Sequence, residues 1–195
     1  MSVTLKNLKE RGMLQYFFHS PLSSLPVRDV RNDLKKGHKT EPHIEIGAEN
    51  YLNCCYQQNI KSFLKNDAKY LFLFTMCKNT SLKYYGTQYI LGILEKEDWG
   101  IRDDKRWFVK GPTKIYNFKD SISVKNIFGK NLSRSDISTH KWVDENLTRK
   151  LLEHFKEKDS ILKDCIKEIQ KLDPNNLTCK KNQCKYIDEC LRNKM

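Results

Sequence analysis

Long apolar runs are absent from this sequence, and their absence excludes the class of proteins that span a membrane with helices. No stretch approaches the roughly 20 apolar residues that a helix needs to cross a bilayer. Residues 1–6 read MSVTLK and show no apolar segment of the kind found in a secretory signal. We therefore expect a soluble protein with no membrane partner.

The sequence also lacks the short motifs that mark common enzyme classes. It contains no phosphate-binding loop of the form GxxxxGKS or GxxxxGKT, no dinucleotide turn GxGxxG and no nucleophile elbow GxSxG. None of the five histidines forms an HxH or HxxxH pair, so a histidine metal site is unsupported. These absences favour a non-catalytic protein. A metal-dependent nuclease is the alternative, because acidic residues around Trp99 could hold a magnesium ion; they are Glu95, Glu97, Asp98, Asp103 and Asp104.

The odd number of cysteines indicates in which cellular compartment the protein is expected. An odd set of seven thiols without a secretory signal does not suit a framework of disulfides. We expect the thiols to stay reduced and the protein to be cytoplasmic.

Three of the cysteines lie close together in a polar segment that has too few apolar residues to form a core around them. Cys179, Cys184 and Cys190 have the spacing C-x4-C-x5-C, and such short loops allow thiolates to converge on one ion. The run resembles the C-terminal iron–sulfur staple of RecB-type nucleases more than a zinc knuckle, which has C-x2-C and a glycine. The resemblance implies a structural iron–sulfur cluster or zinc site. It does not imply nuclease activity, because the acidic and lysine motif of those nucleases is not matched.

A metal site of this kind usually has four ligands, and Cys165 is the nearest candidate for the fourth. Cys54 or Cys55 could instead supply a thiolate from an early part of the chain. Cys165 also has a structural explanation, because it falls at helical spacing on an apolar stripe, where free cysteine is common. That stripe consists of Ile161, Leu162, Cys165, Ile166, Ile169 and Leu172.

Positive charge is in excess and is unevenly distributed. The formal net charge is +12, and residues 105–134 hold eight basic residues against the single acid Asp120. A local excess of this size is typical of a surface that binds a phosphate backbone. The alternative is a lysine-rich surface that only faces water. We take nucleic acid, either DNA or RNA, as the expected partner.

The apolar pattern predicts strands and helices in a mixed order. We expect helices over residues 4–12, 27–36 and 48–64, and strands over 14–19, 69–75, 88–94, 107–112 and 114–118. The strands at 69–75 and 88–94 should pair antiparallel, and a Gly-Pro turn should separate the last two. Asp144 is a good N-cap for a helix that extends to Leu172, with a break near 158–160.

This order of elements resembles a known superfamily. The segments YLFLFT at 70–75, YILGILEKEDW at 89–99 and RWFVKGPTKIYNF at 106–118 are similar to the small barrels of the PUA-like superfamily, in particular its EVE and YTH-related branch. The resemblance implies a partly open β-barrel with flanking helices, and a close backbone approach at a glycine such as Gly92. It also implies that the protein reads nucleic acid, with a flipped or modified base held in an aromatic pocket.

A pocket for a flipped base needs flat rings to replace lost stacking and cations to hold the backbone. Trp99, Trp107 and Trp142 offer the largest rings, and Tyr85 lies in the predicted hairpin. The alternative is that these rings pack, because a tryptophan is more often a packing residue than a ligand platform, and Tyr85 would then cover the open edge of the barrel. The predicted nucleic-acid-binding residues are Tyr85, Trp99, Lys105, Arg106, Trp107, Lys110 and Lys114.

These observations predict an α+β protein with two parts. Residues 1–143 form a small mixed or antiparallel β-barrel domain with an N-terminal extension. Residues 144–195 form a long helical segment that ends in the cysteine-rich tail, for which Cys165, Cys179, Cys184 and Cys190 are the predicted metal ligands.

Overall fold

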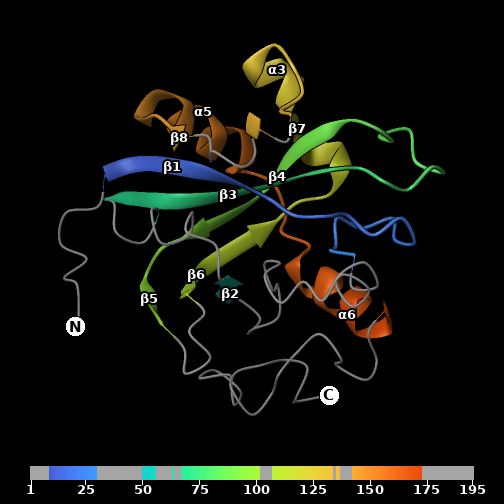
Figure 1. The fold of residues 1–195 in the computed structure, drawn as a ribbon, viewed down its shortest axis with the longest axis horizontal. Coiled ribbons are helices and arrows are strands. Elements are labelled where there is room, and N and C mark those ends of the chain that lie inside the picture. Colours follow the sequence, from blue (N-terminus) through green and yellow to red (C-terminus); the bar gives the residue numbers. More distant parts are fainter. Residues whose placement is uncertain are drawn as a thin grey trace.

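The computed structural model describes residues 9–29, 50–55, 63, 67–101, 107–133, 135–136 and 142–172. Its strands are β1 (Lys9–Tyr16), β2 (Asn50–Cys55), β3 (Ala68–Met76), β4 (Gln88–Glu95), β5 (Asp98–Ile101), β6 (Trp107–Ile115), β7 (Ile122–Ser123) and β8 (Trp142–Val143). Its helices are the 3-10 turn η1 (Phe118–Asp120) and the α-helices α3 (Val124–Phe128), α5 (Glu145–Phe155) and α6 (Leu162–Leu172). The chain is therefore α+β, as its sequence predicts (Figure 1).

The strands form one mixed sheet with an open path. Its order is β2-β6-β4-β3-β1-β8, with β5 beside β6 and β7 beside β4. Only β1 and β3 are parallel; the other pairs of described strands are antiparallel. Within the described residues, β2 and β8 end this path and do not pair with each other.

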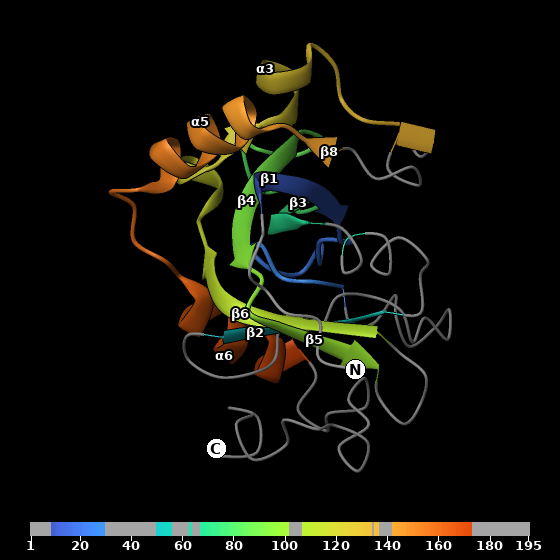
Figure 2. The same cartoon turned by 90° about the vertical axis from the view of Figure 1, so that its left-hand side faces the viewer.

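Strand β6 bends and so joins two parts of the sheet. Residues 107–112 pair with β2, and residues 107–110 also pair with β5 on the other side. The last residues, 113–115, pair instead with β4. As a result, β2, β5 and the start of β6 form a layer that is turned at an angle to β1, β3 and β4 (Figure 2). Val109 of this layer is buried in the same apolar cluster as Leu71 and Leu94 of the central strands.

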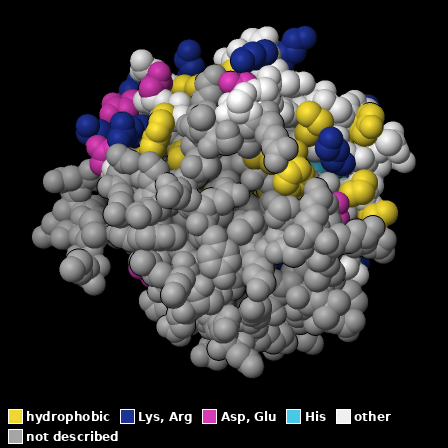
Figure 3. Space-filling view, in the orientation of Figure 1, with side chains coloured by type: hydrophobic (Ala, Val, Ile, Leu, Met, Phe, Trp, Pro, Cys, Tyr) yellow, Lys and Arg dark blue, Asp and Glu magenta, His cyan; other side chains and the backbone are white. Residues whose placement is uncertain are grey.

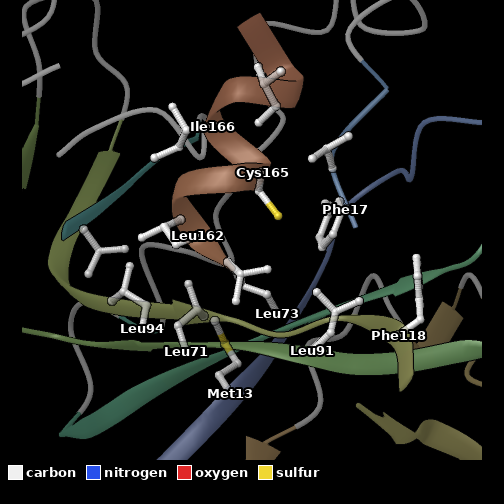
Figure 4. Close-up of a cluster of buried hydrophobic side chains, with 14 of the residues drawn as sticks. Met13, Phe17, Leu71, Leu73, Leu91, Leu94, Phe118, Leu162, Cys165 and Ile166 are labelled. Atoms are coloured by element: carbon white, nitrogen blue, oxygen red, sulfur yellow. The ribbon is translucent and has the colours of Figure 1, made fainter. Parts of the chain in front are cut away.

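Two apolar clusters cover the two faces of the central strands. One lies under α5 and α3 and includes Leu14, Phe72, Ile90 and Phe155. The other lies under α6 and includes Met13, Leu71, Leu73, Leu91 and Cys165 (Figure 4). Because both faces are buried, β3 and β4 are continuous apolar runs with no polar side.

Several predicted elements are confirmed. The strands at 69–75 and 88–94 form an antiparallel pair, with Leu73 opposite Gly92. A Cβ at Gly92 would lie 2.7 Å from Ile115 Cδ1, so the close approach expected at this glycine is present. The Asp144 side chain accepts a hydrogen bond from the Leu147 amide at 2.8 Å, which caps α5. The helical segment also breaks between α5 and α6, as predicted.

Other predicted elements are wrong. Residues 9–12 belong to strand β1 and not to a helix, because they pair with β3 and β8. Residues 50–55 form β2 where a helix was expected, because they pair with β6. The start of the helix expected at 27–36 is also wrong, because Arg28 forms a β-bridge with His19; residues 30–36 lie outside the described part.

The Gly-Pro pair at Gly111 and Pro112 does not end a strand. It lies inside β6, at the bend where the strand changes partners. Among the helices of the described residues, none has the length and apolar content needed to cross a membrane.

Candidate nucleic-acid interface

Three lysines of the basic run follow one another along β6, η1 and α3, and the first of them lies on the side of the sheet that carries α3 and α5. Lys114 is opposite Ile93 in the β4–β6 pair, and Ile93 belongs to the cluster under α5. Directly opposite residues of an antiparallel pair share a face, so Lys114 emerges on that side. Lys119 follows in η1 and Lys125 in α3, and all three are exposed.

These lysines are not neutralised by acidic neighbours. Within the described residues, Lys114, Lys119 and Lys125 form no ion pair, whereas Lys130 pairs with Asp136 at 3.3 Å. The one acid of the run, Asp120, accepts a hydrogen bond through its carbonyl oxygen from Lys158 Nζ at 3.0 Å. Figure 3 shows Lys and Arg side chains over α3, at the top of the view. The described surface therefore retains the positive charge of this run.

Tyr85 lies in the hairpin between β3 and β4 and is 55% exposed. The neighbouring Tyr84 points the other way, and its ring stacks on Phe118 with centroids 5.7 Å apart. Lys83 Nζ lies 5.4 Å from the centroid of Tyr84. The sequence places Tyr85 in this hairpin, but it gives no sign that only one of two adjacent tyrosine rings is exposed.

The structure gives the backbone positions of two predicted tryptophans. Trp99 is in β5, opposite Val109 of β6, and Trp107 opens β6 opposite Ile101. The two strands are therefore neighbours, and both residues lie on the same paired ribbon. Lys110 is opposite Asp98 on this ribbon. Lys105 and Arg106 lie outside the described residues, as do Asp103 and Asp104.

Trp142 is the tryptophan whose side chain is described, and it lies apart from the hairpin at the β1–β8 edge. It is 41% exposed, and the guanidinium carbon of Arg11 lies 5.3 Å from its ring centroid. Arg11 also donates a hydrogen bond to Asp67. This cation–π contact joins residues that are far apart in sequence, so no local pattern could have predicted it.

Cys165 is buried in the cluster under α6. Its side chain points toward the sheet beside Phe17 and Leu73 (Figure 4), and burial raises the pKa of its thiol. The predicted apolar stripe on α6 is therefore confirmed. The other predicted ligands, Cys179, Cys184 and Cys190, lie outside the described residues, and for Cys54 and Cys55 only the backbone is described, in β2.

The acidic residues near Trp99 are partly described. Glu95 forms an ion pair with Lys69 at 2.9 Å, and Glu97 and Asp98 are exposed. Across the described ranges, no group of three His, Cys, Asp or Glu side chains is placed to hold a metal ion.

Sequence reasoning missed one buried cation close to this region. Lys96 is 3% exposed, and its ammonium group donates a hydrogen bond to the Phe63 carbonyl oxygen at 3.1 Å. It also lies 4.6 Å from the centroid of the Phe63 ring. Burial lowers the pKa of Lys96 to about 8, and the nearby Asp67 carboxylate opposes this shift. A lysine between two acidic residues gives no local signal of burial.

Comparison of the chain with protein-family models, with curated proteins and with solved structures found no match.

Proposed function

We propose that this protein is a non-catalytic nucleic-acid-binding module. The observation that carries the proposal is the series of exposed lysines Lys114, Lys119 and Lys125, which form no ion pair with any residue that the structure describes. Cations that keep their full charge at the surface attract a polyanion and release its counterions on contact. The net charge of +12 supports the same partner class.

The resemblance to the PUA-like superfamily makes this proposal more specific. A bent β6 with strands on both sides is compatible with the wall of a partly open barrel. In this proposal, Trp99 and Trp107 hold a flipped or modified base, and Lys105, Arg106, Lys110 and Lys114 hold the backbone. The two tryptophans occupy nearby backbone positions on the same face of the β5–β6 ribbon.

A structural metal site in the tail is a separate part of the proposal. Cys179, Cys184 and Cys190 would bind zinc or an iron–sulfur cluster, with a fourth ligand from Cys165, Cys54 or Cys55. In this proposal the zinc ion or iron–sulfur cluster has a structural role only, because it would attach the tail to the rest of the chain. Metal analysis of protein purified without oxygen tests this, together with Cys→Ser variants at each position. A metal-free protein whose tail thiols are all alkylated would contradict it.

Salt dependence is the direct test of nucleic-acid binding. We expect the logarithm of the affinity for a short DNA or RNA to fall linearly with the logarithm of salt concentration. The triple variant Lys114→Gln, Lys119→Gln and Lys125→Gln should reduce the slope by roughly 0.7 to 0.9 for each phosphate that the variant no longer neutralises. Fluorescence anisotropy of a labelled oligonucleotide measures both quantities.

Lys171→Gln is the matched control for this experiment. Lys171 is highly exposed on α6, which covers the opposite face of the sheet, and it pairs with Glu168 at 3.5 Å. The control should leave both affinity and slope unchanged. Binding that is insensitive to salt, or no binding at low salt, would contradict the proposed function.

A further inference from the structure

The hairpin between β3 and β4 is held in one shape by its own backbone. The amide of Cys77 donates to the Thr87 carbonyl, and the amide of Gly86 donates to the Cys77 carbonyl, both at 3.0 Å. Gly86 has a φ of 76°, a conformation that glycine adopts without strain. A further turn is closed by the amide of Tyr85, which donates to the Leu82 carbonyl at 3.0 Å. Tyr85 is therefore attached to an ordered turn.

The same hairpin is fastened to the body of the protein by side chains. Asn79 Nδ2 donates to the Ser23 carbonyl oxygen at 3.0 Å, and the amide of Lys78 donates to His19 Nδ1 at 3.0 Å. The ring of Tyr84 packs on Phe118 and contacts Tyr89 edge to face. These contacts fix the base of the hairpin and leave the adjacent Tyr85 facing solvent.

The chemistry of the hairpin surface is cationic and apolar. No Asp or Glu occurs in the sequence between Asp67 and Glu95. Lys78 and Lys83 are exposed beside Tyr85, and Leu22 is exposed on the loop to which the hairpin is fastened. At the right-hand end of Figure 3, where Figure 1 shows this hairpin and the loop at residues 20–29, apolar side chains lie with a Lys or Arg and with an Asp or Glu.

We propose that Tyr85 is a stacking platform for an unpaired base, so that the preferred partner is single-stranded nucleic acid. This inference rests on the proposed function and names its substrate class. In a duplex, both faces of each base are covered by neighbouring bases, whereas a base in a single strand can stack on an exposed ring. Lys78 and Lys83, which are exposed on the same hairpin, would supply the cations for the phosphates of the bound strand. Because the turn is already ordered, Tyr85 loses little conformational freedom on binding.

The test separates stacking from charge. Binding is measured to a single-stranded oligothymidine and to a strand of the same length made of abasic sites, which carries the same phosphates without bases. Tyr85→Ala should weaken binding to oligothymidine about tenfold, since stacking on an aromatic ring contributes about 1 to 3 kcal/mol per base. It should not change binding to the abasic strand. Tyr85→Phe, which keeps the ring, should restore binding to oligothymidine.

The other possible outcomes of this experiment would overturn the stacking role of Tyr85, the proposed function, or both. Equal weakening for both strands, or no effect of Tyr85→Ala, overturns the inference while salt-dependent binding still supports the proposed function. No binding of the wild-type protein to any strand overturns both. Self-association that Tyr85→Ala abolishes, measured by sedimentation, would make the hairpin a protein-docking surface and overturn the stacking role. Thermal unfolding of each variant should match that of the wild-type protein, because Tyr85 is exposed.

Discussion

Gly111 of β6 lies so close to the backbone of Glu95 that a Cβ at Gly111 would stand 1.6 Å from the Glu95 carbonyl oxygen. Glu95 is the last residue of β4, and β5 begins at Asp98. Strands β4 and β5, two of the three strands that pair with β6, therefore meet at the point where β6 bends. Only a residue without a side chain allows this approach.

Gly111→Ala should disrupt the bend of β6. The added methyl group meets backbone atoms and no flexible side chain, so one strand must move. We expect the free energy of unfolding to fall by about 3 kcal/mol, at the upper end of the cost of overpacking. Urea denaturation followed by circular dichroism measures the change.

Gly86→Ala is the control for the bend. A Cβ at Gly86 would have no atom within 4 Å, but its φ is 76°. Its cost should therefore be only the strain of a left-handed residue, about 1 to 2 kcal/mol. Equal effects of the two variants would show that the Glu95 contact does not constrain β6.

The sequence predicted the elements whose signals are local. Residues 69–75 and 88–94 are continuous apolar runs because both faces of β3 and β4 are buried. The N-cap at Asp144 is encoded within three residues of the helix start. The positive charge of residues 105–134 can also be read directly from the sequence. The same is true of the position of Tyr85 in a polar hairpin.

The remaining elements depend on contacts between distant parts of the chain. Residues 50–55 have an apolar spacing that suits a helix, and they become a strand because β6 supplies their hydrogen-bonding partners. Gly111 and Pro112 give the signal of a turn, yet the pairing with β2 and β4 keeps the strand continuous. The opposite orientations of Tyr84 and Tyr85 depend on Phe118, which no local pattern reveals.

His19 should make the protein less stable in acid. It is 1% exposed; its Nδ1 accepts from the Lys78 amide, so Nε2 carries the proton and donates to the Leu25 carbonyl at 2.9 Å. Burial lowers the pKa of His19 from 6.5 to about 4, against the raising effects of the Leu25 hydrogen bond and of Asp29. The unfolded chain then binds more protons between these values, so stability falls as pH decreases through this window.

The loss attributable to His19 should approach about 3 kcal/mol at the acid end of that window. His19→Gln removes the titrating group and keeps a side chain that can donate and accept. The wild-type protein should be the more stable of the two near neutral pH, and its advantage should shrink on acidification. Urea titrations at several pH values measure this, and parallel curves for the two proteins would contradict the prediction.

Lys96 should make the protein more stable in alkali, in the same direction of pH as His19. Its pKa is lowered from 10.5 to about 8 by burial, with opposition from Asp67. Between these values the unfolded chain keeps the proton that the folded protein has released, so stability rises with pH through this window. The gain attributable to Lys96 is up to about 3 kcal/mol.

Lys96→Met isolates this contribution because methionine fills a similar volume without titrating. Near neutral pH the variant avoids burying a charge, although it leaves the Phe63 carbonyl without the Lys96 hydrogen bond. The stability of the wild-type protein relative to this variant should rise between about pH 8 and pH 10.5. A difference that does not vary with pH would show that Lys96 is protonated equally in both states.

Cys165 and Cys77 should be protected from alkylation in the native protein. Both side chains are 0% exposed, and burial raises the pKa of each thiol, which lowers the fraction of reactive thiolate. Iodoacetamide labelling followed by mass spectrometry should modify them only after urea is added. Rapid labelling of Cys165 without denaturant would contradict the packing of α6 on the sheet.

Substitution at Cys165 gives a second measure of the same packing. Cys165→Ser places a hydroxyl among apolar side chains such as Leu73 and Ile166, and burying it without a partner should cost about 1 to 3 kcal/mol. Cys165→Ala removes the sulfur atom without adding a polar group and should cost less. Urea denaturation of metal-free protein compares the two variants. If serine costs no more than alanine there, the hydroxyl has found a partner or water, and the burial of Cys165 among apolar side chains would be contradicted.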